Sequence, residues 1–156
     1  MTDAIKFDGS DLRVIEKPIA QVSTLSNISI AFTVKSIFDV AKSSGDQNFS
    51  LIEKTVHKPY IKDYDTAENE GPNRWARHFD LANWGLLIVE ANDALIGGTV
   101  IAYNTPGVEM LEGRTDLAML WDIRLHPDVR GRGVGTALFK SAELWSLKNG
   151  CREIKV

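Results

Sequence analysis

Residues 129–136, with the sequence VRGRGVGT, combine two arginines and three glycines in a spacing suited to phosphate binding. An apolar run precedes them and an amphipathic run follows, so we predict a strand, a loop and the first turn of a helix. Backbone N–H groups at a helix N-terminus have no helical partner and favour an anion. Glycines let the backbone approach a phosphate, and the guanidinium group of one arginine can bind two phosphate oxygens at once. We therefore predict a phosphate site formed by Arg130, Gly131, Arg132, Gly133, Val134, Gly135 and Thr136.

The spacing of these glycines distinguishes between the common phosphate-binding loops. A dinucleotide-binding loop needs a small residue where Thr136 stands and an acidic residue about 20 positions later, where the sequence ends. A nucleotide triphosphate loop needs a Gly-Lys pair five and six residues after Gly131, and none is there. The pattern that fits is R-x-x-G-x-G, at Arg130, Gly133 and Gly135.

A carboxylate lies just before this loop. Asp122 stands in the apolar run 116–125 (DLAMLWDIRL), where burial would raise its pKa and suit it to accept a proton. The alternative is a structural aspartate satisfied by Arg124 or by backbone amides, and the sequence leaves both roles open. Other candidates for the same role are Glu90, Glu109 and Glu112.

The run LWDIRLHPDVRGRGVG, from Leu120 to Gly135, resembles the acetyl-CoA-binding motif of the GNAT acetyltransferase superfamily. The resemblance covers the last third of the chain and, more loosely, the two strands before it. Within the superfamily it is similar to streptothricin and small-amine acetyltransferases. It implies an α/β fold with a mixed central β-sheet flanked by helices, in a single domain over 1–156 with a CoA-binding β-α-β core at 116–156.

The resemblance also implies a reaction and a site. Acetyl-CoA would be the co-substrate, its pyrophosphate on the amides of 130–136 and its pantetheine arm on the backbone of Ile123 and Leu125. A thioester is already activated, so a primary amine of a small molecule could attack it directly, with Asp122 taking the proton and no metal involved. The alternatives are an acetyltransferase for a protein amine, or an acyl-CoA-binding module without turnover.

The rest of the chain is expected to support this core. Alternating or continuous apolar runs predict strands at 12–16, 85–90, 95–103, 116–125 and 151–156, with a helix over 133–148. The last strand, helix and strand form a unit that we expect to be parallel. Helical spacing predicts a further helix at 27–41, broken at 43–46. The stretch 47–83 is a helix pair or a functional loop.

Several other residues invite a functional reading that the sequence does not favour. Cys151 is expected to be a small buried hydrophobe, and the three histidines have no metal-ligand spacing. The segment 63–69 lacks the glycine of a calcium loop and is expected to be a solvated acidic loop. Trp121 and Trp145 are expected in the core. Packing is also favoured over a substrate pocket for Tyr60, Tyr64, Trp75 and Trp84.

Composition limits the partners. Eighteen basic and 21 acidic residues give a net charge of −3, which argues against a nucleic-acid partner. No apolar run in the sequence is long enough to span a membrane as a helix. A single cysteine fits a cytoplasmic protein. GNAT relatives continue with a helix that carries a proton-donating tyrosine, whereas this sequence stops at Val156. We therefore expect a fold incomplete at the C-terminus, either truncated or completed by another subunit in a homodimer.

Overall fold

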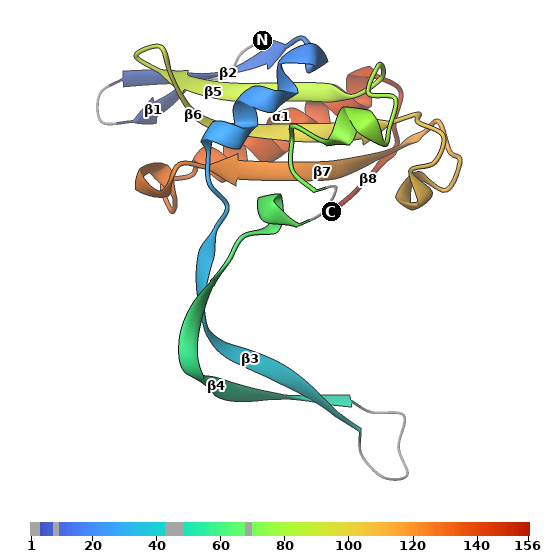
Figure 1. Cartoon of the computed structure of the whole chain (residues 1–156). Coiled ribbons are helices and arrows are strands. Elements are labelled where there is room, and N and C mark those ends of the chain that lie inside the picture. Colours follow the sequence, from blue (N-terminus) through green and yellow to red (C-terminus); the bar gives the residue numbers. More distant parts are fainter. Residues whose placement is uncertain (1–3, 8–9, 43–48, 68–69) are drawn as a thin grey trace.

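The computed structural model describes residues 4–7, 10–42, 49–67 and 70–156. Six strands form one sheet in the order β1-β2-β5-β6-β7-β8, and every neighbouring pair is antiparallel except the parallel pair β7–β8 (Figure 1). The strands span Ala4–Phe7 (β1), Ser10–Lys17 (β2), Gly85–Ala91 (β5), Ala94–Tyr103 (β6), Leu117–Leu125 (β7) and Glu153–Lys155 (β8). The predicted mixed α/β fold is confirmed.

Helices cover both faces of this sheet. The α-helix α1, Val134–Lys148, packs on one face, and short 3₁₀ helices lie on the other. These are η1 (Ile19–Asn27), η3 (Trp75–Arg77) and η4 (Glu109–Leu111). Strand β5 is apolar at successive positions because both its faces are buried: Leu87 and Val89 face α1, whereas Leu86 and Ile88 face the 3₁₀ helices. No helix in the described part of the chain is long and apolar enough to span a membrane.

The elements predicted for the second half of the chain are confirmed to within a few residues. Asn92 and Asp93 make the turn between β5 and β6 with positive φ values of 48° and 62°, as a tight hairpin requires. The β7–α1–β8 unit is parallel, with Leu117 opposite Glu153 and Met119 opposite Lys155.

The helix predicted at 27–41 is wrong. Residues Phe32–Lys42 form strand β3, which pairs with β4, Phe49–Lys62, in a separate two-stranded ribbon. The segment is rich in β-branched residues such as Thr33, Val34 and Ile37, which favour strands. Apolar residues lie on both faces of the ribbon, so the alternation that would identify a strand is missing. The predicted break at 43–46 lies outside the described residues.

The ribbon extends away from the sheet (Figure 1), and β3 and β4 make few contacts with other described elements. The pairing is irregular between Val34 and Ser36, where β4 places residues 56–59 opposite a single residue of β3. Extra residues of this kind bend a strand pair. The stretch 47–83, expected to be a helix pair or a functional loop, contains strand β4 instead over Phe49–Lys62, followed by the 3₁₀ helices η2 (Tyr64–Thr66) and η3.

Candidate active site

A bulge in β7 decides where the charged side chains of this strand point. Val100 of β6 lies opposite Asp122, whereas the next residue, Ile101, lies opposite Leu120, so Trp121 is one residue more than β6 can match. Leu120 packs in the core against α1. Because the extra residue shifts the alternation, Trp121, Asp122 and Arg124 all face the opposite side of the sheet.

Arg124 is the most connected residue on that side. Its side chain is only 1% exposed, and its Nε donates a 2.7 Å hydrogen bond to Asp122. Its Nη1 and Nη2 donate to the two carboxylate oxygens of Asp65 at 2.7 and 3.3 Å. Nη1 also donates to the backbone carbonyls of Leu25 and Ile28, at 3.4 and 3.1 Å. One guanidinium therefore joins β7 to η2 and to the end of η1.

The surroundings of Asp122 bear on both roles that its sequence position left open. Its side chain is 14% exposed and accepts the Arg124 bond through Oδ2, as a structural aspartate would. It also lines a cavity, where a second molecule can reach it. Burial raises the pKa of Asp122, while the neighbouring Arg124 acts in the opposite direction. A carboxylate with a raised pKa is a suitable proton acceptor.

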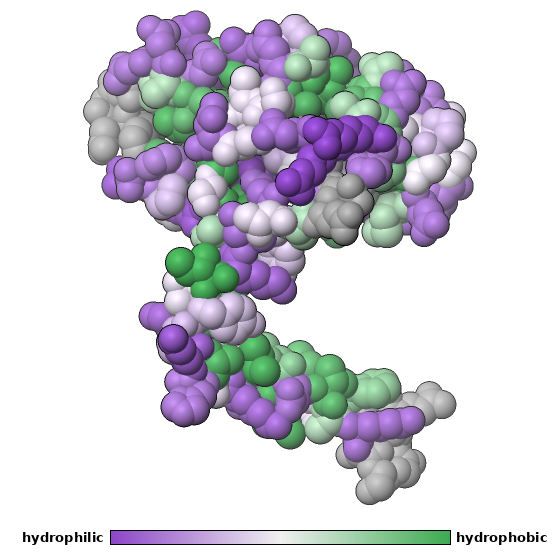
Figure 2. Space-filling model, viewed as in Figure 1, coloured by the Kyte–Doolittle hydropathy of each residue, from purple (hydrophilic) through white to green (hydrophobic). Residues whose placement is uncertain are grey.

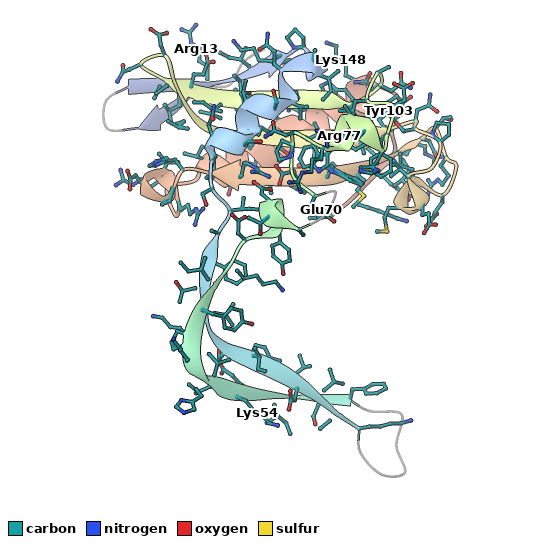
Figure 3. The ribbon with its side chains drawn as sticks, viewed as in Figure 1. Arg13, Lys54, Glu70, Arg77, Tyr103 and Lys148 are labelled. Atoms are coloured by element: carbon teal, nitrogen blue, oxygen red, sulfur yellow. The ribbon has the colours of Figure 1, made fainter. Side chains whose placement is uncertain are left out.

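The cavity next to Asp122, which we call the acceptor cavity, has a volume of about 350 Å³. Three carboxylates, those of Asp65, Glu70 and Asp122, line it against one guanidinium, that of Arg124. Glu70 lies beside η2, below β7 in the view of Figure 3. The remaining lining residues are Ile30, Tyr64, Gly71, Trp75, Met119 and Trp121. The cavity is therefore acidic with an aromatic wall.

The aromatic residues divide between the cavity and the core. Tyr64, Trp75 and Trp121 line the cavity. Trp75 is also 4% exposed and belongs to a core cluster against which Trp121 packs, so the packing expected of these two residues is confirmed. Tyr64 is 51% exposed, contrary to the expectation that it would pack. Trp75 and Trp121 meet edge to face, with ring centroids 6.3 Å apart. Trp84 is buried, as expected, and donates through Nε1 to Thr105.

Tyr60 and Trp145, the two other aromatic residues whose place was expected from the sequence, lie away from the cavity. Tyr60 lies on the ribbon and is exposed, so it neither packs in the core nor lines the cavity. Trp145 belongs to the core, as predicted, and donates through Nε1 to Glu16.

The glycine loop precedes α1 as predicted. Gly131 and Gly133 have φ values of +72° and +84°, a conformation that residues with a Cβ rarely adopt. Gly133 is the N-cap of α1 and supplies no side chain to its N–H groups, and the first turn has no acidic residue. The amides that begin α1 are thus accessible to an anion at the positive end of the helix dipole.

A second hollow of about 320 Å³, which we call the donor groove, runs between this loop and β7. It is lined by Ile30, Ile123, Arg124, Leu125, Arg130 and Gly135. Two of these residues, Ile30 and Arg124, also line the acceptor cavity. The donor groove and the acceptor cavity are therefore neighbours, with Ile30 and Arg124 bordering both.

Backbone groups of β7 are directed at the donor groove. The amide of His126 donates to Ile96 on β6, so strand alternation turns the backbone groups of Ile123 and Leu125 to the opposite edge. Strand β8 pairs only with Leu117–Met119, and no described strand covers this edge at Ile123. The Leu125 carbonyl already accepts a 3.1 Å hydrogen bond from Arg130 Nε, which corrects the expectation that it would be open.

Other expected candidates lie elsewhere. Glu90 pairs with Lys17 at 3.5 Å, and Glu112 pairs with Lys155, while Glu109 lies on η4. None of the three lines the acceptor cavity or the donor groove, so they are not alternatives to Asp122.

Two further expectations can be compared with the structure. Asp65 was expected in a solvated loop, but it belongs to the site because its carboxylate accepts hydrogen bonds from Arg124. The one feature of the sequence that drew attention to it was its spacing from Asp63, which resembles part of a calcium loop. Cys151 is buried in the core, as predicted, and burial raises its pKa.

The sequence model of the acetyltransferase (GNAT) family matches residues 50–156. The chain belongs to this family. The acetyltransferase identity expected from the Leu120–Gly135 motif is thereby confirmed. A search of curated protein sequences gives no match.

Among solved structures, nourseothricin acetyltransferase is similar over 90% of this chain and 69% of its own, with 21% identity and a TM-score of 0.58. A candidate streptothricin acetyltransferase from Bacillus anthracis, solved with acetyl coenzyme A, is similar over 92% of this chain and 72% of its own. It shares 19% identity with a TM-score of 0.58. At these identities the likeness establishes the fold.

Proposed function

We propose that this protein transfers an acetyl group from acetyl-CoA, bound in the donor groove, to a primary amine of a small molecule bound in the acceptor cavity. The observation that carries the proposal is that the two hollows are neighbours, with Ile30 and Arg124 lining both. A glycine loop suited to phosphate lies at one end and an acidic pocket at the other. Two substrates could thus approach each other across the edge of β7.

The donor would bind mainly through backbone groups. The amides of residues 130–136 hold the pyrophosphate, with the guanidinium groups of Arg130 and Arg132 nearby. The pantetheine arm adds to the edge of β7 as an extra strand would, at the backbone of Ile123 and the amide of Leu125. The Ile123 amide is also the group that we assign to polarise the thioester carbonyl.

The transfer itself needs few groups. The neutral amine nitrogen attacks the thioester carbonyl carbon, a C–N bond forms, the C–S bond breaks, and CoA leaves as a thiolate. Asp122 takes the proton that the nitrogen loses, directly or through a water molecule. Because the nitrogen attacks the thioester directly, no covalent intermediate forms on the protein.

The acceptor class follows from the lining of the acceptor cavity. Asp65 and Glu70 favour a molecule with positive charge beyond the reacting amine, and the rings of Trp75 and Trp121 offer an apolar surface to its body. A volume of about 350 Å³ is within the range of small-molecule sites. The names of the two similar structures, which refer to nourseothricin and streptothricin, support the same class.

The test is release of CoA thiol from acetyl-CoA against a panel of mono- and polyamines, amino-sugar antibiotics and a lysine peptide. We expect turnover with polycationic small molecules and none with the peptide. Asp122→Asn should lower kcat by 10²–10⁴-fold, the usual contribution of general base catalysis, with CoA affinity unchanged. Asp116→Asn is the matched control, because Asp116 precedes the same strand but pairs with Arg114. Acetyl-CoA binding without turnover of any amine would contradict the proposal.

A further inference from the structure

The ribbon formed by β3 and β4 exposes large apolar side chains on both of its faces. Val40 lies opposite Leu51, and Phe38 and Phe49 flank this pair on the same face. All four side chains are more than 60% exposed. Ile37 and Ile52 lie on the opposite face and are 43% and 48% exposed. Figure 2 shows apolar surface along the side of the ribbon that faces the viewer.

A ribbon of this kind is poorly stabilised alone. A two-stranded hairpin in water is marginal, and an open edge with apolar side chains is an association site. Within the ribbon, the contacts that help are an ion pair between Lys54 and Asp39 and a hydrogen bond from Ser36 to Glu53. Lys54 lies on the ribbon well away from the sheet (Figure 3). Since apolar residues face both ways, another surface must cover the ribbon for it to be stable.

The charge of the ribbon identifies the surface that fits. Residues 32–62, which include the connection between the two strands, carry five lysines and three acidic residues, a net charge of +2. The rest of the chain carries 13 basic and 18 acidic residues, a net charge of −5. A basic, apolar arm on an acidic body is complementary to the body of another copy of the same chain.

We infer that the ribbon of one copy packs against the body of a second copy, and that the two copies exchange ribbons reciprocally. Strand β3 has 11 residues, and at about 3.4 Å per residue the ribbon is about 37 Å long and roughly 10 Å wide. Two ribbons covered on both faces present roughly 1,500 Å², and the surfaces that cover them add about as much. The total of roughly 3,000 Å² falls in the range of about 2,000–5,000 Å² that obligate homodimers bury. Reciprocal exchange closes the assembly at two copies.

The exchange would also place the second copy beside the acceptor cavity. The foot of the ribbon contacts the cavity wall, since the ring of Phe32 lies 6.1 Å from that of Tyr64, and Lys62 Nζ lies 4.6 Å above the same ring. Tyr64 and Asp65 follow directly after β4. A partner that holds the ribbon therefore also fixes the position of Tyr64.

The test is molecular mass by light scattering over a concentration series. We expect a mass twice the 17.3 kDa of one chain, whereas Leu51→Lys should give a single chain. The matched control is Leu147→Lys on α1, because Leu51 and Leu147 are 66% and 68% exposed. This control should keep the mass of the dimer. High salt should weaken the wild-type dimer, because the ribbon and the body carry opposite charge.

A second variant guards against misfolding of Leu51→Lys. Val40→Thr keeps a β-branched residue in the strand and should raise the dimer dissociation constant without loss of circular dichroism signal. Because mass is measured without substrate, the result is independent of the proposed acetyl transfer. A monomeric wild type, open-ended oligomers, or equal effects of Leu51→Lys and Leu147→Lys would each overturn the inference.

Discussion

Replacing Arg124 with methionine tests the central contact of the site. Methionine keeps the unbranched stem of arginine and removes the guanidinium. The two carboxylates of Asp65 and Asp122 then lose their cation, and the carbonyls of Leu25 and Ile28 lose a donor. Breaking a buried ion pair by removing one partner costs about 3–5 kcal/mol. Because the side chains of Asp65 and Asp122 are 23% and 14% exposed and keep some hydration, we expect about 3 kcal/mol.

The assay is unfolding in urea, which measures the free energy of unfolding. With a slope of about 2 kcal/mol per molar urea, a loss of 3 kcal/mol lowers the midpoint by about 1.5 M. The control is Arg114→Met, which removes partly exposed pairs with Asp116 and Glu153 and should shift the midpoint far less. Adding Asp65→Asn and Asp122→Asn to Arg124→Met should recover part of the loss, since no unpaired buried charge then remains. An Arg124→Met midpoint equal to that of Arg114→Met would refute this account of the site.

Three further predictions concern binding and pH dependence. Gly133→Val forces a β-branched residue into a left-handed conformation at the N-cap of α1, so CoA affinity measured by calorimetry should fall at least tenfold. The control is Gly150→Val, at a similar φ of +83° beyond the other end of α1, which should leave CoA affinity unchanged. Arg130→Ala should weaken CoA binding by about 1.5–3 kcal/mol, and unaltered affinity would remove Arg130 from the site. Asp65→Asn removes a negative charge that raises the pKa of Asp122. In this variant Asp122 is, of these two residues, the one carboxylate that still pairs with the Arg124 guanidinium. That pKa should therefore fall, and the acidic limb of the kcat/KM profile should move to lower pH, whereas movement to higher pH would contradict the reasoning.

The sequence predicted the half of the fold in which local pattern and tertiary role agree. Strands β5, β6 and β7 are apolar and end at turn residues, and α1 has one apolar face after a glycine loop. These signals are local, so a single sequence carries them. The position of the donor groove follows from them, because the loop and β7 are adjacent in the chain.

The sequence could not place the acceptor cavity, because its walls come from distant segments. Asp65 and Arg124 are 59 residues apart, and nothing in the spacing of either marks the other. Strand β3 was predicted as a helix because its exposed apolar residues follow no alternation that would mark a strand. Its partner strand β4 lies across a segment that offered no periodicity of its own. Contacts of this kind appear only when the chain is folded.

The bulge at Trp121 decides which side of the sheet the charged side chains of β7 reach. Without it, the alternation of β7 would turn Asp122 and Arg124 toward α1, where Leu138 and Ala142 are fully buried and offer no charge partner. With it, the two charged side chains face the short helices, where Asp65 and the carbonyls that end η1 receive the guanidinium. Arg124 then borders both the donor groove and the acceptor cavity, so the geometry of both depends on the same side chain. In the proposed reaction, β7 is therefore the strand across which the two substrates approach each other.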